Sequence, residues 1–336
     1  MKEAMFYRKL KDKLVKCELC PNFCIIQDKK IGKCNVRKNI DGKLYSLVYS
    51  KPCSIAVDPI EKKPLYHFYP GSKTLSLATY GCNLFCLHCQ NYSISHEFLE
   101  KDIDAIPTIE PEKIVEEAIS RDINIISYTY TEPTIFFEYT YDIAKLAKKN
   151  KIKNVLVTNG YINEKPLRKL LAYVDAANID LKAMKKDFYL KVCKARLEPV
   201  LKAIKIMHER IWIEITNLII PTLNDSEKDI KKVIDFVASI DKNLPLHFTA
   251  FFPAYKLTNL PPTPENILLK ARSMALNKLH YVYAGNIYNV EANSTYCFNC
   301  KNLLIKRIGF SVVENKLENS KCPYCKTKIA GFFDKF

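Results

Sequence analysis

The chain has 336 residues, of which 48% are hydrophobic and 26% charged, so it can bury one large core and still carry appendages. No apolar run approaches the eighteen or so residues of a membrane span, and the first residues alternate charge with hydrophobicity, so we expect a cytoplasmic protein without a membrane segment. The thirteen cysteines are odd in number and mostly clustered at metal-ligand spacing, which argues against a disulfide scaffold.

Residues 1–70 are predicted to form a separate, basic, cysteine-rich module. Cys17, Cys20, Cys24 and Cys34 form a C-x2-C-x3-C-x9-C array, which suits zinc or an auxiliary iron–sulfur cluster, and zinc is the first expectation. The module carries 15 Lys and Arg against 7 Asp and Glu, which is half of the chain's formal charge of +16. A basic surface can attract RNA, but a solvated lysine-rich surface is the simpler explanation.

Residues 71–285 alternate β-rich runs with helical patterns. The predicted strands, apolar on both faces, are 74–80, 125–130, 154–158, 177–182, 212–220 and 246–252. The predicted helices are 111–121, 134–149, 163–173, 198–209, 226–239 and 264–278. The run Asn224-Asp225-Ser226-Glu227 is a start signal for the fifth of these helices, and Thr263 is expected to cap the sixth. Six βα units predict an α/β fold, a partial (βα)6 barrel. Functional groups are expected where its strands end. Residues 280–285 are expected either to cover the open edge of the barrel or to link it to the C-terminal module.

A loop with three cysteines, Cys82, Cys86 and Cys89, follows the first strand in a C-x3-C-x2-C pattern. A structural zinc site needs a fourth ligand, whereas three cysteines on a [4Fe–4S] cluster leave one iron open to bind something else. In this context the pattern resembles the radical S-adenosylmethionine (SAM) superfamily over residues 74–285. The resemblance implies that the open iron binds SAM and that an electron cleaves it to a 5′-deoxyadenosyl radical, which abstracts hydrogen from a substrate.

The resemblance also implies which residues hold SAM. Motif matches after strands two, three and four are Glu132, Thr158, Asn159, Asp180 and Lys182. The last four resemble the D-T-N-G and D-x-K motifs of the activating enzymes of glycyl-radical enzymes. There the glutamate holds the SAM ammonium and the lysine meets the carboxylate, while the two acids help to bind a monovalent cation. Because Val157 replaces the first acid, the expectation of that cation is weaker.

Four further residues are candidates for the same site. His88 occupies the position whose backbone reads the adenine amino group, Glu214 is expected to reach the ribose, and His247 contacts the SAM carboxylate or belongs to the core. Cys193 follows strand four on the face where the radical would form. As a catalytic residue its thiol would donate a hydrogen atom or hold an intermediate, and otherwise it is a small buried hydrophobe.

Residues 286–336 are predicted to form a zinc-ribbon-like module. Its ligands, Cys297, Cys300, Cys322 and Cys325, form two C-x2-C knuckles separated by 21 residues. Four thiolates complete a tetrahedron and leave no open position, so the expected site is structural. A second iron–sulfur cluster is the lesser alternative.

The order of these parts resembles the AmmeMemoRadiSam family of radical SAM proteins, which is related to pyruvate formate-lyase activating enzyme. Matching stretches include 58–68 and 251–255. We therefore expect an enzyme that uses the deoxyadenosyl radical on a macromolecule, either a protein glycine or an RNA base, with an electron donor such as ferredoxin or flavodoxin. The competing hypothesis is a non-catalytic iron–sulfur or zinc protein that binds nucleic acid or transfers electrons.

Overall fold

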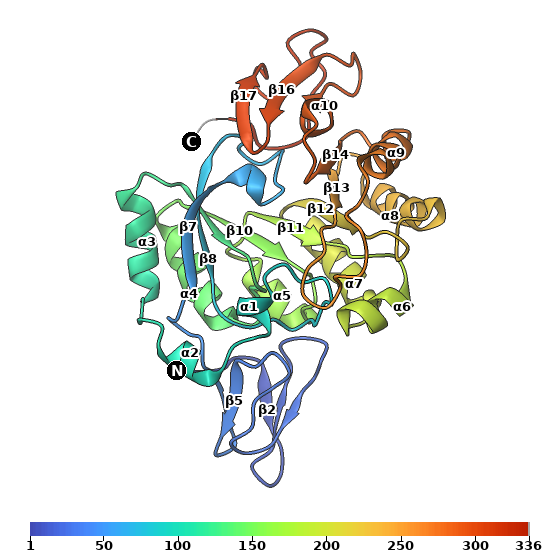
Figure 1. Cartoon of the computed structure of the whole chain (residues 1–336). Coiled ribbons are helices and arrows are strands. Elements are labelled where there is room, and N and C mark those ends of the chain that lie inside the picture. Colours follow the sequence, from blue (N-terminus) through green and yellow to red (C-terminus); the bar gives the residue numbers. More distant parts are fainter. Residues whose placement is uncertain (335–336) are drawn as a thin grey trace.

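The computed structural model describes residues 1–334 and is centred on an open eight-stranded sheet (Figure 1). Its strands are β7 (Ser54–Pro59), β8 (Lys73–Ala78), β9 (Ile125–Tyr128), β10 (Lys153–Thr158), β11 (Ala176–Asp180), β12 (Trp212–Ile219), β13 (Leu246–Ala250) and β14 (Val282–Gly285). They pair in chain order, in parallel from β8 to β14, with β7 antiparallel to β8. Because β7 and β14 are its two edges, the sheet forms a partial barrel, which confirms the predicted fold class.

Helices of the βα units cover the outer face of this sheet (Figure 1). They are α3 (Pro111–Ser120), α4 (Phe137–Lys149), α5 (Glu164–Leu170), α7 (Leu197–His208), α8 (Glu227–Ile240) and α9 (Glu265–Leu276). Each longer helix buries one apolar stripe, such as Ile230, Val233 and Val237 of α8. The shorter pieces are α1 (Tyr92–Ser95), α2 (Glu100–Asp104), α6 (Lys186–Phe188), α10 (Val290–Asn293), the 3-10 turn Ile60–Lys62 and the π-helical turn Tyr189–Cys193.

The N-terminal module lies at the end of the barrel opposite the C-terminal module (Figure 1). One of its sheets contains β1 (Lys2–Glu3), β6 (Lys43–Ser46) and β5 (Arg37–Ile40), and the other contains β2 (Tyr7–Lys9), β3 (Val15–Cys17) and β4 (Ile25–Ile26). A buried ion pair of 2.6 Å between Arg37 and Glu138 of α4 joins this module to the barrel.

The expected module boundary at residue 70 needs a correction, because β7 already belongs to the barrel sheet. This edge strand alternates half-buried and exposed residues over most of its length, unlike the fully buried strands that the sequence pattern favoured. After β7, the chain crosses the amino end of β8, beside the C-terminal module, before β8 begins (Figure 1). Leu65, Tyr66, His67 and Phe68 of this connection are all buried.

The C-terminal module is a three-stranded antiparallel sheet of β15 (Thr295–Tyr296), β16 (Leu303–Ile308) and β17 (Ser311–Asn315). Arg307 anchors it to the connection between β7 and β8, since its buried guanidinium donates to the Tyr66 carbonyl at 2.7 Å and lies 3.5 Å from the Glu61 carboxylate. Across residues 1–334, no helix combines the length and apolar character needed to cross a membrane.

Candidate functional site

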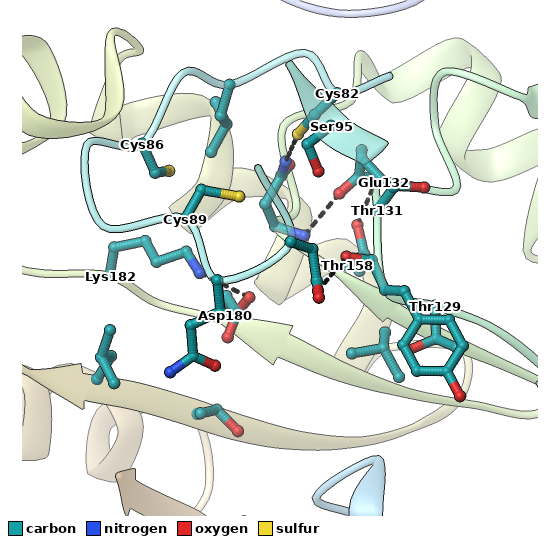
Figure 2. Close-up of a pocket in the computed structure, with 18 of the residues that line it drawn as sticks. Cys82, Cys86, Cys89, Ser95, Thr129, Thr131, Glu132, Thr158, Asp180 and Lys182 are labelled. Atoms are coloured by element: carbon teal, nitrogen blue, oxygen red, sulfur yellow. Dashed lines mark hydrogen bonds and ion pairs between the residues drawn. The ribbon is translucent and has the colours of Figure 1, made fainter. Parts of the chain in front are cut away.

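A cavity of about 550 Å³ lies where the parallel strands end (Figure 2). Its wall combines the loop after β8 with residues that end or follow β9, β10 and β11. The predicted residues that line it are Cys82, Cys86, His88, Cys89, Glu132, Thr158, Asn159, Asp180 and Lys182. The structure therefore brings together all of the predicted motif residues in one place.

The three cysteines after β8 reach this cavity from a single loop (Figure 2). The loop is fixed by backbone hydrogen bonds, in which the amides of Phe85 and Leu87 donate to the carbonyls of Cys193 and Val192, both at 2.9 Å. Within residues 1–334, these three sulfurs are not among the candidate metal ligands that lie within 4.8 Å of one another. They are thus spread around a volume larger than one metal ion, which fits a cluster whose cysteines each bind a different iron.

The carboxylate of Glu132 is buried at the cavity wall and accepts four hydrogen bonds. Oε1 accepts from the Thr134 amide at 3.0 Å, the Thr134 hydroxyl at 2.6 Å and the Thr158 hydroxyl at 2.8 Å, and Oε2 accepts from the Asn159 amide at 2.8 Å. Burial raises the pKa of this carboxyl, and the hydrogen bonds oppose that rise. In the part of the chain that the structure describes, no cationic side chain pairs with Glu132, so its oriented oxygens are suited to a cationic group of a ligand.

The side chain of Asn159 connects this carboxylate to the cysteine loop. Its Nδ2 donates to Asn83 Oδ1 at 3.0 Å and contacts Cys82 Sγ at 3.7 Å. The Tyr161 amide donates to its Oδ1 at 2.8 Å, which fixes the orientation of the side-chain amide. Asn159 therefore couples the position of one cysteine sulfur to the end of β10.

A lysine–aspartate pair forms the opposite wall of the cavity (Figure 2). Lys182 Nζ lies 2.7 Å from Asp180 Oδ2. Burial by itself lowers the pKa of the Lys182 ammonium, but the Asp180 carboxylate and the sulfurs of Cys86 and Cys193 together outweigh it and leave the pKa raised. The ammonium is therefore charged at neutral pH and is available to an anionic group of a ligand.

The imidazole of His88 is buried beside the same cavity. Burial lowers its pKa to about 3, so the ring is neutral at physiological pH. Neither of its ring nitrogens has a hydrogen-bond partner within residues 1–334. Because buried polar atoms are normally paired, this ring points to a polar ligand in the cavity.

Comparisons with known proteins agree with this geometry. The model of the radical SAM superfamily matches residues 76–237. The uncharacterized protein MJ0808 of Methanocaldococcus jannaschii is 49% identical over 336 residues, which cover 98% of this chain and 99% of that protein. The chain belongs to the radical SAM superfamily.

Within this superfamily, the chain is similar to activating enzymes. The putative glycyl-radical enzyme activating enzyme MJ1632 of the same organism is 28% identical over 223 residues, which cover 63% of this chain and 80% of that protein. The crystal structure of Streptococcus suis SuiB bound to S-adenosylmethionine superposes with a TM-score of 0.51 at 14% identity, over 68% of this chain and 53% of that chain, and so shares the fold.

Membership of the superfamily implies a [4Fe–4S] cluster and SAM, and the cavity residues fit both groups. Three cysteines line the cavity, and a [4Fe–4S] cluster held by three cysteines keeps one iron open for SAM. The unpaired Glu132 carboxylate and the charged Lys182 suit the ammonium and carboxylate of an amino acid.

The structure corrects the expected roles of Glu214 and His247, which do not line this radical SAM cavity. Glu214 is the third residue of β12 and therefore faces the amino ends of the strands. Its carboxylate accepts hydrogen bonds from the Tyr66 and His67 amides at 3.0 and 2.7 Å, and lies 2.7 Å from His247 Nε2. Both side chains thus hold the connection between β7 and β8 in place, far down the strands from the cysteine loop.

The structure also places Cys193 outside the cavity lining. Its side chain is fully buried in the π-helical turn after α6, and its carbonyl accepts a hydrogen bond from the Phe85 amide of the cysteine loop. The expected catalytic role has no geometric support, because a substrate in the cavity does not reach this thiol. Its backbone instead helps to hold the cysteine loop in place.

The prediction missed a second group of polar residues in the cavity wall. Lys63 is buried there and pairs with Asp58 at 2.7 Å, while the Tyr130 hydroxyl donates to the same carboxylate. Burial lowers the pKa of Lys63 to about 8. Lys63 and Tyr130 are far apart in sequence. The one sequence feature that could have indicated this group is the pair Lys62-Lys63 before a proline. Phe310, at the β16–β17 turn, adds a half-exposed apolar edge.

The C-terminal cysteines are assembled as predicted for one metal ion. The sulfurs of Cys297 and Cys325 lie 3.5 Å apart and those of Cys300 and Cys322 lie 3.6 Å apart. All four ligand atoms lie within 4.8 Å of one another, so they can hold a metal ion. About 3.8 Å is the sulfur–sulfur spacing around a tetrahedral zinc with bonds of about 2.3 Å.

Proposed function

We propose that this radical SAM protein binds a [4Fe–4S] cluster through Cys82, Cys86 and Cys89 and uses SAM to abstract a hydrogen atom from a macromolecular substrate. One observation carries the proposal: free thiols, an unpaired buried carboxylate and a lysine–aspartate pair converge on one cavity at the strand ends. When bound, the cluster supplies one electron, from a donor such as ferredoxin or flavodoxin, that cleaves SAM to methionine and a 5′-deoxyadenosyl radical.

The residues of the chain bind and orient SAM. Glu132 receives the ammonium through a carboxylate whose Oε1 and Oε2 are held in place by Thr158 and Asn159, respectively. Lys182 receives the carboxylate, and Asp180 positions the lysine. These two contacts orient the amino-acid part of SAM toward the cysteine loop.

The neutral ring of His88 is free to share hydrogen bonds with the adenosyl part of SAM. Both of its nitrogens lack partners in the described residues, and the residue immediately precedes the third cysteine. We therefore assign it to the nucleoside end of the site.

We infer that the substrate is a segment of another protein. The similarity over 223 residues to a putative glycyl-radical enzyme activating enzyme supports this class. The cavity is polar around the cysteines, whereas Phe310 offers an apolar contact at its edge for a side chain of an inserted peptide.

Formation of 5′-deoxyadenosine tests the reaction. Anaerobically reconstituted protein with dithionite and SAM is expected to release it, and Cys86→Ala is expected to abolish the product. Cys53→Ala is the control, because Cys53 is also a free cysteine but is half-buried and lies outside the cavity. Absence of product from the wild-type protein would support the non-catalytic alternative.

The substrate class is tested by mass spectrometry of cells with and without the gene. We expect a mass difference in a peptide, because a protein segment is the proposed substrate. A difference confined to RNA would overturn the protein assignment and leave the SAM chemistry intact.

We also propose that the C-terminal cysteines bind zinc as a structural ion. Their spacing suits one tetrahedral ion, and four thiolates leave no position for a substrate. Metal analysis of the wild-type protein is expected to find one equivalent of zinc per chain. Cys322→Ser is expected to lose both the zinc and the structure of the C-terminal module. Iron in place of zinc at these four cysteines would contradict the assignment.

A further inference from the structure

Four cysteines of the N-terminal module line a second, separate cavity. They are Cys17, Cys20, Cys24 and Cys34. The first ends β3, the next two lie in the connection from β3 to β4, and the last lies in the turn before β5. Cys17 and Cys34 are buried and the other two are half-buried, so this is an interior site.

The spacing of these sulfurs differs from that of the zinc-ribbon cysteines. Within residues 1–334, the ribbon cysteines are the one group of three or more candidate ligands whose ligand atoms all lie within 4.8 Å. No three sulfurs of the N-terminal module meet that limit, although all four cysteines line one cavity. In this respect they behave like the three cysteines of the SAM site. A single zinc draws its thiolates closer together than a cluster does, because in a cluster each cysteine binds a different iron.

The cavity also contains an unpartnered hydrogen-bond donor. Arg37 lines it with a side chain that is 2% exposed, and its Nε has no hydrogen-bond partner in the described residues. The rest of its guanidinium is occupied, since it donates to both Glu138 oxygens at 2.8 and 2.6 Å. A buried free N–H beside four thiols indicates an anionic acceptor, which the thiolates and sulfides of an iron–sulfur cluster supply.

We propose that these four cysteines hold a second [4Fe–4S] cluster, in place of the zinc ion that their sequence spacing first suggested. Since all four irons then have a cysteine ligand, this cluster has no open position for SAM. Its remaining chemistry is the transfer of one electron.

The N-terminal site is in direct contact with the SAM-cluster loop. A Cβ added at Gly81, the residue before Cys82, would lie 2.8 Å from the Cys34 carbonyl oxygen. Asn22, between two of the N-terminal cysteines, donates from Nδ2 to the Asn83 carbonyl at 2.9 Å. The second cluster is thus placed to accept one electron from a reduced ferredoxin or flavodoxin and to pass it to the SAM site, after which it is oxidised again. This role rests on the proposed function, whereas the presence of the cluster does not.

Metal content of a variant without the SAM-cluster ligands tests the proposal. The triple variant Cys82→Ala, Cys86→Ala, Cys89→Ala is reconstituted anaerobically with iron, sulfide and zinc. We expect about four irons per chain, against about eight in the wild type, and the electron paramagnetic resonance signal of a reduced [4Fe–4S] cluster. A variant with no iron and a second equivalent of zinc would overturn the proposal. No SAM cleavage is measured, so the result is independent of the proposed function.

Further replacement of Cys20 and Cys24 by Ser in this variant locates the remaining iron. The iron is expected to disappear while the zinc of the ribbon stays, since the ribbon lies at the other end of the barrel (Figure 1). Iron that survives these replacements would show that the cluster lies elsewhere.

Electron transfer is tested in the protein with an intact SAM site. With reduced flavodoxin as donor, Cys20→Ser is expected to slow deoxyadenosine formation at least tenfold while the Kd for SAM is unchanged. An unchanged rate in a variant that has lost the second cluster would overturn the electron-transfer role.

Discussion

At the scale of single residues, position along a strand decides whether a side chain reaches the site. Thr158 and Asp180 are the last residues of β10 and β11, and the sequence identified both because a polar motif directly followed an apolar run. Glu214 lies on an equally apolar strand but near its start. The sequence did not reveal this difference, since the partners of Glu214 come from the distant segment around His67. The same holds for Lys63, whose burial follows from long-range contacts alone.

Replacement of Glu132 by Gln is expected to weaken SAM binding. The charge-assisted contact to an ammonium contributes roughly 1.5–3 kcal/mol, so Kd should rise about ten- to hundredfold in equilibrium binding to the reconstituted protein. Glu112→Gln on the exposed face of α3 is the control and should leave Kd unchanged. Equal Kd values for Glu132→Gln and wild type would contradict the assignment of the ammonium to this carboxylate.

At the scale of helices and strands, the apolar patterns located every βα unit, but local capping rules succeeded only in part. The predicted start signal at 224–227 is confirmed, since Ser226 caps α8 with its Oγ accepting from the Asp229 amide at 3.2 Å. The predicted cap at Thr263 is wrong, because its hydroxyl donates to the Ile219 carbonyl at 2.6 Å and accepts from the Phe251 amide. Thr263 joins strand ends that are distant in sequence, and such a contact depends on the assembled sheet.

Gly81 is expected to tolerate no side chain. Its φ is +100°, and a Cβ would lie 2.7 Å from Val36 Cγ1 as well as against the Cys34 carbonyl. Gly309 also has positive φ, +58°, but nothing lies within 4 Å of its Cβ position, so Gly309→Ala measures backbone strain alone, about 1–2 kcal/mol. Gly81→Ala should lower the free energy of unfolding by a further ~1–3 kcal/mol in urea titrations. Similar losses in the two variants would mean that the modules do not touch at this point.

At the scale of the whole molecule, one buried ion pair links the N-terminal module to the barrel. Arg37 and Glu138 are 2% and 1% exposed, so Arg37→Met leaves a buried carboxylate without a partner and should destabilise the protein by about 3–5 kcal/mol. Arg8 and Glu18 form an exposed pair, so Arg8→Met should change stability by less than about 1 kcal/mol. The stabilities of Arg37→Met and Arg8→Met are compared by thermal and urea unfolding. A loss of less than about 1 kcal/mol in Arg37→Met would show that the N-terminal module docks on the barrel without this ion pair.

Acid is expected to destabilise the protein through His67. Burial lowers its pKa to about 4 from a usual value of 6.5, so between these values the unfolded chain binds the proton more readily. The folded protein is therefore most stable with respect to this group above about pH 6.5. The free energy of unfolding falls as pH drops toward 4, by roughly 2 kcal/mol between pH 6.5 and 5. Urea unfolding of His67→Gln should therefore depend less steeply on pH in this window. His208→Gln should follow the wild type, and equal slopes for all three proteins would exclude His67 as the cause.

The connection between β7 and β8 determines how anything can move through the barrel. It crosses the amino ends of the strands, where the Asn178 side chain donates to the Pro64 carbonyl, Glu214 accepts from two of its amides, and His67 contacts the Tyr283 hydroxyl. These contacts close that end of the barrel, and Lys63 and Pro64 of the same connection line the cysteine cavity from there. A polymer therefore cannot be threaded through the molecule. A segment that enters the cavity must therefore leave by the same route.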